Sequence, residues 1–155
     1  MSGMFAAVFI ALFAAHQVGD HWVQTGCQAA TKGLPGRPGR WACTKHVATL
    51  TATKAVLLAL AAAVLDLHLT AAGLAIGLGV DAASHWWADR RTTLAALARA
   101  VDKTEFYDLG TPAHPNHPVT ADGSYAPTLG TGAYSLDQSF HILWLFTAAL
   151  IITAV

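Results

Sequence analysis

Histidine and aspartate stand four residues apart at several places in this chain of 155 residues. The pairs at this spacing include His16 with Asp20, His85 with Asp89, and Asp137 with His141. Residues four apart lie on one face of an α-helix, so each pair can present two side chains to one ion. Imidazole nitrogens and carboxylate oxygens bind Zn²⁺, Mn²⁺ and Fe²⁺, and a ligand set without cysteine favours a catalytic site with an open position. The spacing therefore predicts a metal centre.

Three further residues extend this candidate site. His46 follows a basic segment, and Asp81 lies one turn before His85, where it is predicted either as a ligand or as a group that orients an imidazole. Lys54 stands deep in an apolar segment, where a cation needs a partner, so we expect it to pair with a carboxylate such as Asp81 or to contact an anionic substrate group. We therefore predict catalytic roles for Asp81 and Lys54. The predicted metal ligands are His16, Asp20, His46, His85, Asp89, Asp137 and His141.

The composition indicates the kind of molecule that must position these side chains. Hydrophobic residues make up 54% of the chain and charged residues only 12%, and the mean hydropathy is +0.44. These values predict an all-α integral membrane protein with one domain, residues 1–155. Nine basic and nine acidic residues cancel, so nucleic acid is not expected as a partner. Cys27 and Cys43 match neither a metal motif nor a disulfide framework, so we expect free thiols.

The hydrophobic segments predict a bundle of four transmembrane helices. Residues 24–41 read as a loop because they are rich in glycine, proline and basic residues. Residues 90–103 predict a short amphipathic helix at the membrane interface after the third span, and an irregular loop follows, up to residue 133. Its histidines, His114 and His117, are expected to be solvated rather than ligands. The predicted spans are residues 4–23, 42–65, 71–89 and 134–155.

The basic residues predict the orientation of these spans. Lysine and arginine concentrate in the first and third connections and are missing from both ends of the chain, so those connections should lie in the cytoplasm and both termini outside. Tryptophans flank the same connections, as expected of an aromatic belt: Trp22, Trp41, Trp86 and Trp87. Alternating helix directions then bring the histidines and aspartates of all four spans to the cytoplasmic end of the bundle.

A short internal repeat suggests how many ions the site holds. His16 and Asp20 are followed by a basic loop and His46, much as His85 and Asp89 are followed by His141. Such a repeat predicts a pseudo-twofold arrangement that suits two metals. For the site as a whole we expect one or two divalent ions, with zinc as the first candidate and iron or manganese as alternatives. Bound metal would activate water and polarise a carbonyl or phosphoryl oxygen.

The predicted function is that of a metal-dependent hydrolase in the membrane. Its expected partners are membrane lipids and a lipid or other membrane-delivered substrate, and a homo-oligomer is compatible with the sequence. Two alternatives stay open. A di-iron membrane oxidoreductase would use similar ligands, and a metal-ion or proton transporter would use paired aspartates and histidines as a relay.

Nearly the whole chain also resembles a known family. The residues that carry the resemblance are His16-Gln-Val-Gly-Asp20-His-Trp-Val-Gln24, Lys32-Gly, His46, Asp81-x-x-x-His85-x-x-x-Asp89 and Asp137-Gln-x-x-His141. This pattern is similar to that of the small bacterial and prophage membrane proteins classed as domain-of-unknown-function family 3307. The resemblance implies a bacterial inner-membrane protein and carries no activity. In its style, the site also resembles those of membrane-bound metal-dependent hydrolases.

Overall fold

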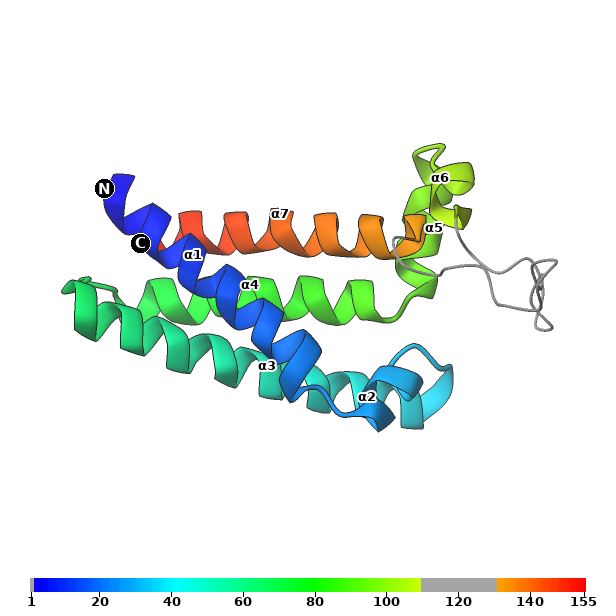
Figure 1. Ribbon diagram of the computed structural model, residues 1–155, viewed down its shortest axis with the longest axis horizontal. Helices are drawn as coiled ribbons and strands as arrows, with labels where there is room; N and C mark the ends of the chain where they lie inside the picture. The colour runs from blue at the N-terminus through cyan, green and yellow to red at the C-terminus, as the bar shows by residue number, and fades with distance from the viewer. Residues whose placement is uncertain (1, 110–130) are drawn as a thin grey trace, which may run out of the picture.

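The computed structural model describes residues 2–109 and 131–155, which form helices and turns with no strand among them (Figure 1). The predicted all-α class is therefore confirmed for this part of the chain. Short helices occupy the connections: α2 (Gly26–Thr31), α5 (Thr92–Ala100) and α6 (Thr104–Asp108). The long elements are α1 (Ser2–Val18), which continues into the π-helical turn η1 (Gly19–Val23), α3 (Gly36–Leu65), α4 (Ala71–Asp89) and α7 (Gly132–Ala154).

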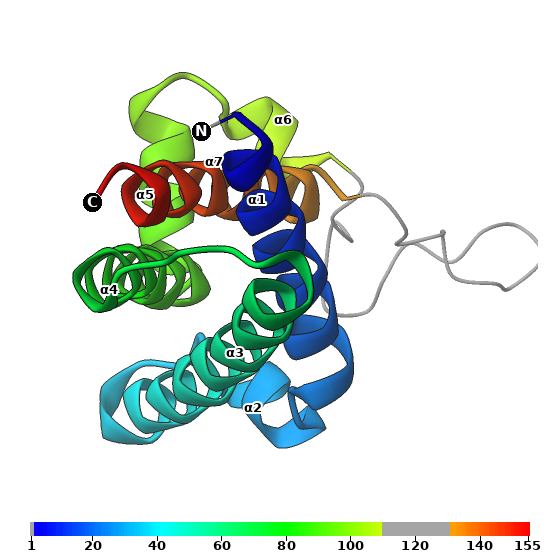
Figure 2. The ribbon, with the colours of Figure 1, turned by 90° about the vertical axis from the view of Figure 1, so that its left-hand side faces the viewer.

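The long helices run along the same axis of the molecule with alternating direction. Both termini and the connection from α3 to α4 lie at one end, whereas α2, α5 and α6 lie at the other (Figure 1). Figure 2 looks along the bundle and shows α1, α3, α4 and α7 grouped around a common interior. We call the end that carries α2, α5 and α6 the basic end, because the lysines and arginines of both connections lie there.

Three helical segments among the described residues are long and apolar enough to cross a membrane: Gly3–Val23, Gly36–Leu65 and Gly132–Ala154. The sequence predicts four spans. Helix α4 has the bounds of the predicted third span, Ala71–Asp89, and its 19 residues are long enough to cross a membrane, but it is less apolar than these three segments. Asp81 and Asp89 are part of the reason, since carboxylates lower the mean hydropathy of a helix.

The predicted loop at residues 24–41 is wrong in part. It contains α2, which begins with a capping box in which Thr25 and Gln28 exchange hydrogen bonds at 2.9 and 3.2 Å. It also contains the start of α3, since Pro38 lies in the first turn of this helix. Proline is tolerated in a first turn, where its missing N–H would have no helical partner.

The connection from α4 to α7 is also more ordered than predicted. Helix α5 lies within the expected amphipathic segment and buries Leu94 and Ala98. Helix α6 occupies residues that were expected to be irregular. Thr131 caps α7 by accepting a hydrogen bond from the Tyr134 backbone N–H at 3.1 Å, so this helix begins before the predicted residue 134. The predictions for His114 and His117 lie outside the described residues.

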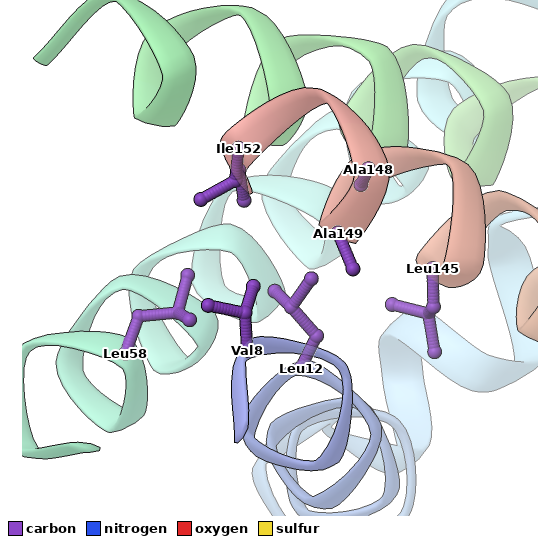
Figure 3. Close-up of a cluster of buried hydrophobic side chains, with 7 residues drawn as sticks. All are labelled: Val8, Leu12, Leu58, Leu145, Ala148, Ala149 and Ile152. Atoms are coloured by element: carbon purple, nitrogen blue, oxygen red, sulfur yellow. The ribbon is translucent and has the colours of Figure 1, made fainter. Parts of the chain in front are cut away.

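An apolar cluster fills the bundle at the end that carries both termini (Figure 3). It joins apolar side chains of α1, α3 and α7. Its members are Val8, Leu12, Leu58, Leu145, Ala148, Ala149 and Ile152.

The predicted free thiols are confirmed, with Cys27 exposed and Cys43 buried.

Two glycines allow α4 to pack closely on α7. Gly73 and Gly77 are four residues apart, and a Cβ atom at Gly77 would lie 2.5 Å from Ile152 Cγ1 and 2.9 Å from the Ala148 carbonyl oxygen. Small residues at this spacing let two membrane helices approach closely. The contact holds α4, with its polar residues, in the bundle.

We expect Gly77→Val to destabilise the protein by about 1–3 kcal/mol or more, because the two helix backbones must move apart. Thermal unfolding followed by circular dichroism in detergent measures this loss. Gly79→Val is the matched control on the same helix, since nothing lies within 4 Å of a Cβ at Gly79. Equal unfolding temperatures for the two variants would contradict the close-packing argument.

Candidate metal centre

Histidines and aspartates from all four long segments meet near the basic end of the bundle. Each is buried or almost buried, although the segments are far apart in the sequence. They are His16 of α1, Asp20 of η1, His46 of α3, His85 and Asp89 of α4, and His141 of α7. The structure therefore brings together six of the seven predicted ligands.

Asp20, His46 and His85 place three ligand atoms at the spacing that one ion requires. His46 Nε2 lies 3.0 Å from Asp20 Oδ1 and 3.1 Å from His85 Nε2, and the distance from His85 Nε2 to Asp20 Oδ1 is 3.9 Å. Ligands about 2.0–2.1 Å from a tetrahedral zinc ion are about 3.3 Å apart. We call these three residues the primary group.

Asp89 lies beside the primary group. Its Oδ2 atom is 3.3 Å from His46 Nε2 and 3.2 Å from His85 Nε2. With His85 and His141, Asp89 also forms a second group whose ligand atoms all lie within 4.8 Å of one another. His85 thus belongs to both groups.

His16 completes a set of three neighbouring imidazoles. Its ring centroid lies 5.4 Å from that of His85 and 5.1 Å from that of His141. The rings of His85 and His141 stack with centroids 4.0 Å apart. His16 is fully buried and is therefore placed to extend the second group.

Many polar atoms of these residues have no hydrogen-bond partner among the described residues, although buried polar atoms nearly always have one. They are Asp20 Oδ1, Asp89 Oδ2, His85 Nδ1, His141 Nε2 and both ring nitrogens of His16. Two of them, the carboxylate oxygens, face imidazole Nε2 atoms. Where such a nitrogen carries no proton, its lone pair and those of the carboxylate oxygen point towards each other, so a shared cation fits this arrangement.

Gln24 determines which ring nitrogen of His46 carries the proton and which one faces Asp20 and His85. In the amide orientation that satisfies its neighbours, Gln24 Oε1 accepts hydrogen bonds from His46 Nδ1 at 3.1 Å and from Lys32 Nζ at 2.8 Å. With its proton on Nδ1, a neutral His46 directs the lone pair of Nε2 towards Asp20 and His85. Such orienting partners are typical of metal-binding histidines.

We expect Gln24→Leu to weaken metal binding by about 10–100-fold, the usual effect of removing a partner of a metal-binding histidine. Gln24→Glu should keep most of the affinity because it restores an acceptor for His46 Nδ1. Gln17→Leu, on α1, is the control. Zinc titration of the purified protein with a competing chelator measures all three, and equal affinities for the leucine variants would contradict the orienting role.

Lys32 is a second contributor, for which the sequence predicts no role in the site although the residue belongs to the family pattern. Its ammonium lies 2.9 Å from Asp89 Oδ1 and 3.5 Å from Asp20 Oδ1, and the side chain is 10% exposed. Arg90 in turn donates hydrogen bonds to the carbonyl oxygens of Lys32 and Leu34, which fixes the turn after α2. Lys32 is therefore held where it neutralises part of the carboxylate charge.

Lys54 and Asp81 form an ion pair deeper in the bundle. Lys54 Nζ lies 2.6 Å from Asp81 Oδ2, and the two residues are 0% and 3% exposed. The predicted pairing of Lys54 with a carboxylate is confirmed. The predicted catalytic roles of both residues stay a prediction, and their burial in a shared ion pair favours a positioning role.

Asp137 lies at the edge of the site rather than within either group. Its Oδ1 atom is 3.5 Å from His141 Nε2, and its side chain is 27% exposed. This position suits an orienting partner of His141 better than a ligand.

A cavity of about 460 Å³ at the basic end reaches the candidate metal ligands Asp20 and Asp89. Asp20, Asp89 and Lys32 contribute to its wall, and Arg91 and Tyr107 also line it. The cavity gives water or a substrate a route to the primary group.

No family model, no curated protein and no solved structure matches this chain. The resemblance to family 3307 therefore stays a prediction, and the chemistry of the site carries the functional argument.

Proposed function

We propose that this protein is a membrane-embedded, metal-dependent hydrolase whose ion, most simply zinc, is held by the primary group. One observation carries the proposal: three buried ligand atoms from three helices lie 3.0–3.9 Å apart beside a cavity. Two imidazoles and a carboxylate leave the remaining position of a tetrahedral ion open, as in catalytic zinc sites.

The chain's own residues divide the work of hydrolysis. Asp20, His46 and His85 would hold the ion, which would supply an activated water and polarise the substrate oxygen. Asp89 Oδ2 accepts the proton of the attacking water and returns it to the leaving group. Lys32 holds the other oxygen of Asp89 and so keeps Oδ2 turned towards the histidines.

The proposal includes a fourth span and a defined orientation. Helix α4 packs on α7 through Gly73 and Gly77 and would cross the membrane with the three more apolar segments. The basic end would face the cytoplasm, with α5 at the membrane interface. Lys45 lies over the ring of Trp41 and Arg90 over that of Trp86, as in an interfacial belt. As the resemblance to family 3307 implies, the proposal assigns the protein to a bacterial inner membrane, and it allows homo-oligomers.

The second group of ligands favours a di-iron oxidoreductase as the alternative function. His85, Asp89 and His141, with His16 beside them, could hold a second ion. A transporter is less well supported, because in the described part of the chain the interior beyond Lys54 and Asp81 is occupied by the apolar cluster. The identity of the metal separates the hydrolase from the oxidoreductase.

Metal analysis of the detergent-purified protein tests the proposal. We expect zinc, no absorption bands of a di-iron centre, and hydrolysis of phosphate-ester or carboxylic-ester lipids that stops on chelation and returns with zinc. Asp89→Asn should keep the zinc but lose at least about 100-fold in rate, as expected of a proton-transfer group. A protein that holds iron with its typical spectrum, or that binds no metal, would overturn the proposal.

A further inference from the structure

A second hollow lies next to the cavity that reaches the metal-binding residues. It has a volume of about 200 Å³, lies between α5 and α7, and is lined almost entirely by apolar side chains, among them Leu97, Val101, Phe140 and Leu143. Leu94 lines both hollows, so they lie on either side of this one side chain. We call the second hollow the apolar groove.

Arg91 lies in the short connection between α4 and α5. It lines the cavity, and its Nη2 donates a hydrogen bond to the Ala29 carbonyl oxygen at 3.0 Å. Gly33 makes room for it, since a Cβ atom there would lie 2.7 Å from Arg91 Cδ. A guanidinium has five N–H donors, and no carboxylate in the described ranges 2–109 and 131–155 forms an ion pair with Arg91.

The backbone of Arg91 supports a functional position. Its φ is 58° and its ψ is −49°, in a region that non-glycine residues rarely adopt. Such conformations cost about 1–3 kcal/mol and persist where the surrounding structure holds them, often at functional sites. Here the strained residue lines the cavity and directly precedes α5, whose Leu94 lines both hollows.

The net charge of the cavity depends on whether a divalent ion is bound. Its wall carries three aspartates, Asp20, Asp89 and Asp137, against Lys32 and Arg91, so it is negative by one charge with neutral histidines. A divalent ion makes it positive by one charge. An anionic group would therefore bind to the metal-loaded protein, between the ion and Arg91.

We propose that the substrate is a single-chain amphiphile with a phosphate head, the head contacting the ion and Arg91 and the hydrocarbon chain lying in the apolar groove. This inference rests on the proposed function. A phosphate has enough oxygens to contact an ion and a guanidinium together. In the reaction, the water oxygen bonds to phosphorus and its proton passes to Asp89. The ester P–O bond breaks, and the leaving oxygen takes up the proton from Asp89.

Dodecylphosphonate tests the inference because its C–P bond is not hydrolysed. Native mass spectrometry of the zinc-loaded protein in detergent should show one bound dodecylphosphonate per chain. Dodecanol, which lacks the head, and methylphosphonate, which lacks the chain, should each bind at least about tenfold more weakly. Removing zinc should weaken dodecylphosphonate binding by a similar factor.

Two variants test separately the binding of the phosphate head and the binding of the hydrocarbon chain. Arg91→Gln should weaken dodecylphosphonate binding at least about tenfold, whereas Arg99→Gln, exposed on the same helix, should not. Leu97→Trp, which fills the apolar groove, should weaken dodecylphosphonate but not methylphosphonate, and Ile142→Trp on α7 is its control. All four variants should keep the zinc content of the wild type.

Two results would overturn this inference about the substrate and leave the proposed function standing. One is zinc-loaded protein that binds dodecylphosphonate equally with and without Arg91, and another is equal binding of methylphosphonate and dodecylphosphonate, which would indicate a free phosphate ligand. A protein that binds no zinc would overturn the proposed function and this inference together.

Discussion

Replacing His85 by alanine is expected to remove the metal almost completely, because His85 belongs to both groups of ligands. Zinc binding by protein sites is worth about 10–16 kcal/mol shared among the ligands, so losing one ligand should weaken binding at least about 100-fold. Elemental analysis after dialysis against a weak chelator measures the loss. His85→Asn, which is polar but a poor ligand, should show the same loss if the alanine variant folds poorly.

The same measurement decides how many ions the protein holds. His46 belongs only to the primary group and His141 only to the second group. If two ions bind, His46→Ala and His141→Ala should each retain about one ion per chain; if one ion binds at the primary group, only His46→Ala should lose it. His21→Ala and His68→Ala are matched controls, since both histidines are exposed. Wild-type metal content in the His85 variants would contradict the assignment of this histidine as a ligand.

Lys54→Met is expected to destabilise the protein by about 3–5 kcal/mol, because it leaves the buried carboxylate of Asp81 without its partner. Asp81→Leu should destabilise the protein by a similar amount, because it leaves the buried ammonium of Lys54 without its partner. Unfolding in detergent, followed by circular dichroism, measures both.

The double variant Lys54→Met with Asp81→Leu should regain most of this stability, since replacing both members of a buried ion pair by apolar groups is often neutral. A coupling energy near zero in the double-mutant cycle would show that the pair contributes nothing as a pair. Hydrolysis by the stable double variant then tests the predicted catalytic roles. Unchanged turnover would assign Lys54 and Asp81 to positioning the bundle, and a complete loss would support their catalytic roles.

Much of the candidate site could be predicted because helical spacing is local. His85 and Asp89 share a helix face whatever surrounds them, and alternation of long apolar helices brings their partners to the same end. Glycines and prolines predict the bounds of helices less reliably. Pro38 suggested a loop, yet it lies in the first turn of α3, where its missing N–H has no cost.

The orientation of Asp20 could not be predicted from spacing alone. It lies in the π-helical turn η1, so the regular four-residue periodicity from His16 does not hold there. Gly19 permits this turn to pack against Leu50, whose side chain would collide with a Cβ atom. Single π-helical turns within helices are frequent at functional sites.

Gln24 and Lys32 belong to the pattern of the family resemblance, but neither they nor Arg91 are predicted at the site, because their contacts there depend on how the connections fold back over the bundle. No periodicity relates a residue in an irregular connection to a distant helix. Their side chains reach the site or its cavity only because α2 is held against α3 and α4 by Arg90 and Arg91.

By itself, the sequence determined the helical class, the membrane character and the residue types of the site. These follow from composition and from the 3.6-residue period, which act within single segments. Only the tertiary structure decided which atoms meet: the spacing in the primary group, the tautomer that Gln24 selects and the pairing of Lys54 with Asp81. Distances of about 3 Å between atoms of different helices depend on crossing angles and close glycine contacts, and these result from packing among all the helices together.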